Sequence, residues 1–339
     1  MREAIATQAL DLRDLTVFTE IGTGGYLTTP FIAAMAGARQ TFAITRDSAY
    51  GSAASVAAAA RELARLSGTE GRVQVVAAKT PDTLASADIV TNLGFVRPLD
   101  RNTVADMKPG AVIPLMCEEW EFRGGDVDLD ACSERGIAVV ATNEDYPGVG
   151  VFDFSGPLCM KLLFEAGIEV YMSRVAIVSG DKFGVVIDEC LRLNGAEVRT
   201  IATLRDDAAE SCVAHADAVI VADYCNLELF IGPGGQMEAA RLAHLAPGVA
   251  VIPFAGRVDR DSLQRAGIWC LPESGSEPYR MARTFAHLGV RPVIDLHCAG
   301  LKVAEIVARL GPERRSDRAM RTALGARGCL VSREVRADV

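Results

Sequence analysis

The sequence predicts an α/β protein of two tandem Rossmann-like lobes, each with a doubly wound parallel sheet, facing each other across a cleft. Strand-like apolar runs alternate with helix-like segments along the chain. A length of 339 residues suits two domains of ordinary size. The second half also repeats the first: GDVDLDACSERGIAV from Gly125 matches GRVDRDSLQRAGIWC from Gly256. Turn residues at such places are common in Rossmann-like domains, so the match supports the architecture whether or not the two halves share an origin.

The first lobe is predicted over residues 1–147. Strands are expected where β-branched and apolar residues run between turn signals, and helices where apolar residues recur at helical spacing. The expected strands are Leu15–Ile21, Thr41–Thr45, Val73–Ala77, Ala87–Val90, Ala111–Met116 and Gly136–Ala141. The expected helices are a segment ending near Met35, Ala53–Leu66 and Val127–Arg135. Alternation at this spacing is typical of a parallel sheet.

The second lobe is predicted over residues 148–298. It follows a loop rich in Pro and Gly, and Phe152–Ala166 is expected to form a long buried helix that crosses between the lobes. Val175–Val198 has the pattern of a strand, a glycine turn, a helix and the next strand. Val293–Leu296 is expected to be a strand, and residues 299–339 a C-terminal helix with an arginine-rich tail.

Composition excludes several classes of function. A net charge of −9 and a pI near 5 argue against a surface for nucleic acid or anionic membrane. Nine scattered cysteines without a CxxC pair indicate reduced thiols and no metal site. The N-terminus lacks the apolar stretch of a signal peptide, and no apolar run is long enough for a bilayer. We therefore expect a cytoplasmic protein.

The turn in the second lobe is the first candidate cofactor site. A dinucleotide turn needs glycine at three places, which here are Ser179, Asp181 and Gly184, with Gly180 between the first two. Asp181 would direct a negative charge toward the phosphates. The following strand ends without the acid that binds the ribose of NAD. Arg199 or Arg205 could suit the 2′-phosphate of NADP, and a plain exposed arginine is the alternative for each.

The first lobe has a second glycine turn, Glu20-Ile21-Gly22-Thr23-Gly24-Gly25, between a strand and a helix. Asp47 follows the next strand, near the place of a ribose partner. The stretch resembles the first motif of S-adenosylmethionine-dependent methyltransferases, in which an acidic residue stands two places before the first glycine. The resemblance implies that Gly22, Gly24 and Gly25 would bind the cofactor; an empty glycine turn is the alternative.

His297 is the strongest candidate among the four histidines. It follows the expected strand Val293–Leu296, and open α/β sheets place their chemistry at carboxyl ends of strands. Glu277 ends a glycine-rich loop upstream. A carboxylate that reaches His297 could raise the pKa of the imidazole and orient it as a general acid–base.

From Ala87 to Leu310 the chain resembles the D-2-hydroxyacid dehydrogenases, the family that includes phosphoglycerate and formate dehydrogenases. The matching segments are VDLDA with ERGI from Val127, Phe152–Leu163 at the interdomain helix, Pro247-Gly248 at the KPGA turn, Glu277-Pro278, and LHCAG around His297. The resemblance implies NAD(H) or NADP(H) over Gly180–Gly184 and a homodimer. It also implies that His297 exchanges a proton with the substrate oxygen while Glu277 orients it.

Two further departures from the family concern substrate binding. The family's substrate-binding arginine stands in an ARG triplet, whereas Gly256 takes that place here and Arg257 follows one residue later. The loop that binds the substrate carboxylate is replaced around Trp120, which is flanked by Glu118, Glu119 and Glu121. Such a loop could hold a cationic or hydroxyl-rich substrate, or could be a solvated loop with a packed indole.

Three hypotheses of function follow from these residues. The first is an NAD- or NADP-dependent oxidoreductase that acts on a small 2-hydroxy or 2-oxo acid or a related polar metabolite, with His297, Glu277 and Arg257 at its site. The second is a group-transfer enzyme that binds S-adenosylmethionine or another adenosyl ligand at Gly22–Gly25, with His297 or the acids of Glu118–Glu121 serving the acceptor. The third is a non-catalytic paralogue that keeps the fold.

Overall fold

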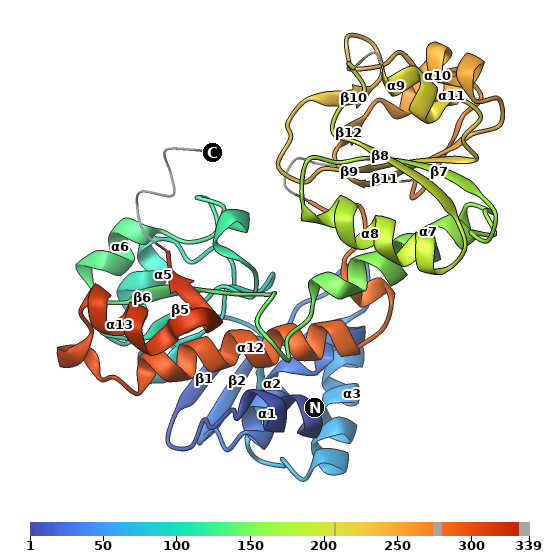
Figure 1. The fold of residues 1–339 in the computed structure, drawn as a ribbon. Coiled ribbons are helices and arrows are strands. Elements are labelled where there is room, and N and C mark those ends of the chain that lie inside the picture. Colours follow the sequence, from blue (N-terminus) through green and yellow to red (C-terminus); the bar gives the residue numbers. More distant parts are fainter. Residues whose placement is uncertain (207, 274–279, 332–339) are drawn as a thin grey trace. The chain divides into compact units, whose positions relative to one another are not determined.

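The computed structural model describes residues 1–206, 208–273 and 280–331 (Figure 1). The chain divides into two compact units: unit 1 consists of Met1–Val151 and Gly289–Val339, and unit 2 of Phe152–Leu288. The first predicted boundary, after residue 147, lies near this change. The second, after residue 298, lies instead within a helix, and the predicted tail segment 299–339 belongs to unit 1.

Unit 1 contains a seven-stranded sheet in the order β14-β6-β5-β4-β1-β2-β3. All of its pairings are parallel except that of β14 with β6. Its strands are β1 (Thr16–Glu20), β2 (Gln40–Ile44), β3 (Val73–Val76), β4 (Ile89–Val90), β5 (Val112–Pro114), β6 (Ala138–Thr142) and β14 (Gly328–Leu330). The parallel part therefore has the 3-2-1-4-5-6 order of a dinucleotide-binding fold.

Helices cover both faces of this sheet. They are α1 (Arg2–Gln8), α2 (Thr29–Met35), α3 (Ala53–Ser67), α4 (Pro81–Ser86), α5 (Arg101–Asp106), α6 (Leu129–Glu134), α12 (Arg291–Ala308) and α13 (Asp317–Leu324). Successive side chains of a strand point to opposite faces. Thus Val17 packs in a core with α12, and Phe18 in a second core with α4 and α6.

Unit 2 contains a parallel five-stranded sheet in the order β13-β11-β9-β7-β8. Its strands are β7 (Arg174–Val178), β8 (Glu197–Ile201), β9 (Ala218–Ala222), β11 (Ala250–Ala255) and β13 (Trp269–Cys270), with a separate pair β10 (Leu229–Ile231) and β12 (Arg257–Val258). Its helices are α7 (Ser155–Glu165), α8 (Lys182–Leu193), α9 (Ala208–Val213), α10 (Ala239–Leu245) and α11 (Arg260–Arg265). Residues 152–166 thus form a short 3-10 turn and α7, close to the predicted helix.

The predicted repeat between the lobes is confirmed at the level of element order, with β3 and β14 as additional edge strands of unit 1. Asp88 Oδ2 accepts the backbone N–H of Thr16 at 2.8 Å, and Asp217 Oδ2 accepts that of Arg174 at 2.7 Å. In each unit the bond joins the start of the first strand to the residue before the central strand. The two doubly wound lobes of the prediction are therefore present.

The prediction of a strand at Val293–Leu296 is wrong, because these residues lie in the first turns of α12. Pro292 occupies the first turn, where its fixed φ suits a helix. The apolar residues continue at helical spacing beyond His297, and Ile294 and Leu301 both enter the core. A Cβ at Gly300 would overlap Met116 Sδ, so this glycine lets α12 approach the end of β5.

Candidate functional site

Ligands of open parallel sheets bind at the carboxyl edge, where the strand order reverses. In unit 1 the order reverses between β1 and β4, and in unit 2 between β7 and β9. Strands β1 and β7 each run into a predicted glycine turn. The two turns differ in whether their backbone N–H groups are available to a ligand.

The turn of unit 1 leaves backbone donors open. Gly22 N–H donates to Tyr26 O at 3.1 Å, and a 3-10 helix, Gly24–Leu27, precedes α2. Within the described residues, the N–H groups of Thr23, Gly24 and Gly25 donate no hydrogen bond. Gly24 has a φ of +58°, and a Cβ there would meet no atom within 4 Å. These three amides and this open space fit an anionic group of a cofactor.

Gly25 is a packing position. A Cβ at Gly25 would lie 2.9 Å from Val293 Cγ2 of α12, so the turn rests directly on this helix. His297 is one turn further along α12, and its ring centroid lies 6.0 Å from that of Tyr26. The structure therefore brings His297 close to the turn Gly22–Gly25.

Two acids flank the turn of unit 1. Glu20, only 6% exposed, accepts the N–H of Phe95 at 2.7 Å. Burial raises the pKa of this carboxyl, and the bond from Phe95 together with the charges of Arg97 and Arg46 partly offsets the rise. Asp47, the predicted ribose partner, uses Oδ1 to accept the N–H of Ala53 at 2.8 Å.

The turn of unit 2 is closed by its own side chains. Ser179 Oγ accepts the N–H groups of Asp181, at 3.3 Å, and of Gly184, at 3.2 Å. Asp181 Oδ1 accepts the N–H of Phe183 at 2.9 Å and thereby caps α8. Asp223 Oδ2 accepts the N–H of Gly180 at 3.0 Å. The donors that would bind pyrophosphate are therefore already occupied.

The charge and the packing of this turn also argue against a dinucleotide there. Asp181 Oδ2 also accepts the N–H of Tyr224 at 2.6 Å, which ties the turn to the end of β9. Burial raises the pKa of Asp181, and the neighbouring Asp223 contributes to the rise. A Cβ at Gly184 would overlap that of Ser179. The predicted cradle Ser179, Gly180 and Gly184 thus does not fit a dinucleotide, because carboxylates occupy the place of its phosphates.

His297 is a buried residue of α12 and not a residue at a strand end. It is 3% exposed, and its Nδ1 lies 2.6 Å from Thr29 Oγ1. Burial lowers the pKa of His297 to about 4, so the ring is neutral at pH 7. Sequence reasoning missed its neighbours Thr29 and Tyr26, although both follow the glycine turn closely.

The structure does not place the other predicted catalytic residues beside His297 in unit 1. Arg257 belongs to unit 2, is exposed, and donates from Nη1 to Leu227 O at 3.0 Å. Glu277 lies outside the described residues. Sequence reasoning also missed Asp223, which its position directly after the central strand β9 could have revealed.

The carboxylates of the glutamate-rich loop of unit 1 accept hydrogen bonds from the loop itself and from neighbouring residues. Glu118 accepts the N–H of Glu144 at 3.1 Å and bonds the Trp120 indole N–H. Glu121 accepts the N–H of Glu118 at 3.1 Å, and Glu119 accepts the Cys329 thiol at 3.1 Å. These bonds favour a structural role for the loop.

Other chemistry is limited in the described part of the chain. Residues 1–206, 208–273 and 280–331 contain no group of three or more His, Cys, Asp or Glu that could hold a metal ion. The nine cysteines are free, and burial raises the pKa of Cys132, Cys298 and Cys329 to about 12. These three thiols stay protonated at pH 7. None of the described helices is long and apolar enough to cross a membrane.

The comparisons with known proteins establish the fold. No family model matches the chain, and no curated protein matches it. One subunit of dipicolinate synthase from Bacillus halodurans matches at 14% identity and a TM-score of 0.54, over 88% of this chain and 98% of that one. The corresponding dipicolinate synthase chain from Bacillus subtilis matches at 12% and 0.55, over 90% and 98%.

A D-isomer specific 2-hydroxyacid dehydrogenase from Lactobacillus delbrueckii ssp. bulgaricus, solved with NAD, also matches, at 13% identity and a TM-score of 0.49, over 87% of this chain and 97% of that one. At such low identity these matches concern the fold alone. The structural matches therefore include a D-2-hydroxyacid dehydrogenase, at low identity.

Proposed function

We propose that the protein is an oxidoreductase that binds a nicotinamide dinucleotide, NAD or NADP, at the glycine turn of unit 1. The single observation that carries this proposal is the contrast between the two turns. The N–H groups of Thr23, Gly24 and Gly25 have no acceptor among the described residues, whereas carboxylates and Ser179 occupy the turn of unit 2.

The position of the open turn supports the same assignment. It follows β1 of a sheet with the 3-2-1-4-5-6 order, beside the point where that order reverses. The sequence resemblance to D-2-hydroxyacid dehydrogenases favours a nicotinamide cofactor, which would supply or accept hydride when bound. Gly24 would let the pyrophosphate approach the backbone, and Gly25 keeps the turn against α12.

The substrate in this proposal is a small 2-hydroxy or 2-oxo acid or a related polar metabolite. His297 remains the proposed acid–base group, because it is the histidine beside the open turn. Its neutral imidazole can accept a proton, and its hydrogen bond to Thr29 fixes the ring. The roles of Glu277 and Arg257 rest on the sequence resemblance alone.

Calorimetric titration with NADH and NADPH tests the proposal. Gly24→Asp places a carboxylate beside the amides, and Gly24→Asn is the neutral control, since both residues tolerate a positive φ. We expect one dinucleotide to bind wild type and Gly24→Asn, and Gly24→Asp to bind it at least about tenfold more weakly. Gly180→Asp should bind like wild type. Loss of binding in Gly180→Asp alone, or no binding by wild type, would overturn the proposal.

A second candidate is group transfer from S-adenosylmethionine, and Glu20 is the observation that favours it. This buried acid precedes the turn and points toward the loop after β4. A carboxylate there would suit a cationic ammonium group better than a pyrophosphate. Titration with S-adenosylmethionine distinguishes the two: binding that Glu20→Gln abolishes, with silence toward both dinucleotides, would establish the second candidate.

A further inference from the structure

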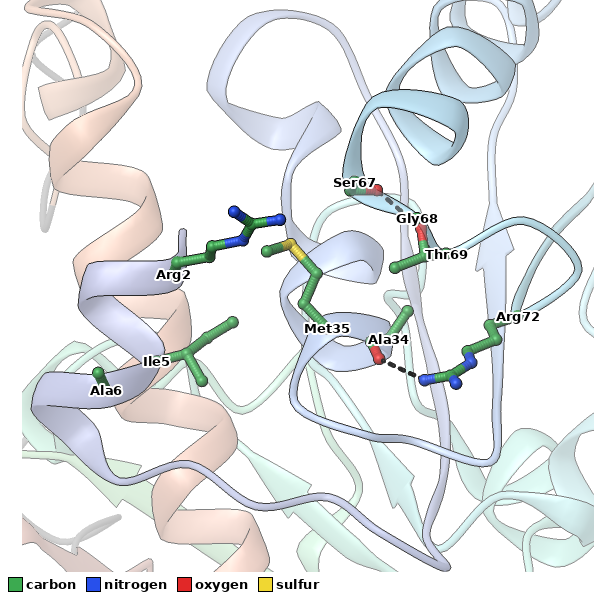
Figure 2. Close-up of a pocket in the computed structure, with 9 residues that line it drawn as sticks. All are labelled: Arg2, Ile5, Ala6, Ala34, Met35, Ser67, Gly68, Thr69 and Arg72. Atoms are coloured by element: carbon green, nitrogen blue, oxygen red, sulfur yellow. Dashed lines mark hydrogen bonds between the residues drawn. The ribbon is translucent and has the colours of Figure 1, made fainter.

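A pocket of about 300 Å³ lies at the amino-terminal edge of the unit 1 sheet, opposite the edge that carries the glycine turn (Figure 2). It is enclosed by α1, the last turn of α2, the end of α3 and the residue before β3. Its lining residues are Arg2, Ile5, Ala6, Ala34, Met35, Ser67, Gly68, Thr69 and Arg72. This volume is within the range of small-molecule sites.

Two arginines line this pocket from opposite sides, Arg2 beside Met35 and Arg72 beside Ala34 (Figure 2). Arg72 Nη1 makes one long bond, 3.5 Å, to Ala34 O. Arg2 forms no hydrogen bond or ion pair within the described part of the chain. Nearby arginines of the same unit differ, since Arg13 pairs with an aspartate and Arg65 with a glutamate.

The charge of the pocket is unusual for this protein. The chain carries a net charge of −9, yet no carboxylate lines the pocket. Two guanidinium groups without a carboxylate partner attract carboxylates and phosphates and can bind them through paired N–H groups. The local charge therefore selects an anion.

The other lining residues indicate what kind of molecule would carry the anionic group. Ile5 and Met35 are partly exposed and form the apolar side of the pocket. Opposite them, Ser67 donates to Leu63 O at 2.6 Å and its hydroxyl lies 2.8 Å from that of Thr69. An apolar body with one anionic group would satisfy both sides of the pocket.

We propose that this pocket is a second ligand site, independent of the glycine turn, which binds a small organic anion with an apolar body. Arg72 binds its carboxylate or phosphate group, Arg2 adds positive charge on the other side of the pocket, and the wall formed by α1 and α2 contacts its apolar part. Because the site is at the other edge of the sheet, its ligand does not compete with the proposed cofactor.

Titration calorimetry with phenyl phosphate tests this site in the full chain. Arg72→Ala should weaken binding about tenfold or more, since it removes a charged donor. The matched control Arg61→Ala removes an exposed arginine of α3 outside the pocket and should bind like wild type. Gly24→Asp should also bind like wild type, which separates this site from the glycine turn.

Gly68 provides a variant pair that fills the pocket without removing an arginine. Its φ is +69°, and a Cβ there would meet no atom within 4 Å. Gly68→Asp should weaken phenyl phosphate binding about tenfold relative to the isosteric Gly68→Asn, by charge repulsion. Equal affinity of these two variants, loss of binding in Gly24→Asp, or no binding of phenyl phosphate by wild type would overturn the proposal.

Discussion

Replacing Asp181 by alanine tests whether side chains close the turn of unit 2. The carboxylate caps α8 through Phe183 N–H at 2.9 Å and accepts Tyr224 N–H at 2.6 Å. Loss of a cap costs about 1 kcal/mol, and loss of the second acceptor about 1 to 3 kcal/mol more. Relief of the repulsion from Asp223 offsets part of this. We expect a net loss of about 2 kcal/mol, or a Tm lower by about 4 to 8 °C.

Thermal and urea unfolding of Asp181→Ala beside Asp259→Ala measures this loss. Asp259 caps α11 in the same unit through one bond, to Ser262 N–H at 2.7 Å, so its removal should cost about 1 kcal/mol. An Asp181→Ala variant that unfolds like Asp259→Ala or later would refute the reasoning, because the bond to Tyr224 would then contribute nothing.

Three other changes test the surroundings of the open turn. Gly25→Ala should lower the free energy of unfolding in urea by about 1 to 3 kcal/mol, because its Cβ would press on Val293, and the loss should be smaller in a Val293→Ala background; an equal loss in that background would contradict the packing. His297 has a pKa lowered from 6.5 to about 4, so the unfolded chain binds more protons than the folded one between these values, and up to about 3 kcal/mol of stability should disappear as the pH falls through this window. A wild-type urea midpoint with the same pH dependence as that of His297→Gln would contradict this. Glu20→Gln should keep or raise the Tm at pH 7, because burial disfavours the charged carboxylate; a clear fall would show that the charge is stabilising.

Patterns of local residues predicted most of the fold. The alternation of strands and helices is a local pattern, so the sequence displays it directly. The strand predicted at Val293–Leu296 failed because four residues are too few to show the helical period that continues through Leu301. The predicted cleft and homodimer remain predictions.

The candidate site was predictable in part. The weakness of the Ser179–Gly184 turn was visible from Asp181, since a carboxylate at a helix N-terminus occupies the place of an anion. The second carboxylate, Asp223, comes from a strand distant in the sequence, so only the folded sheet brings it to Gly180. The burial of His297 likewise depends on packing against α2, and the residues next to His297 in the sequence do not reveal this packing.

A crystal structure of the protein soaked with NADH or NADPH tests the location of the cofactor most directly. The account predicts density for the pyrophosphate over Thr23, Gly24 and Gly25 of unit 1, within hydrogen-bond distance of their N–H groups. Density for the pyrophosphate along Ser179–Gly184 of unit 2, with Asp181 and Asp223 displaced from the backbone, would contradict it.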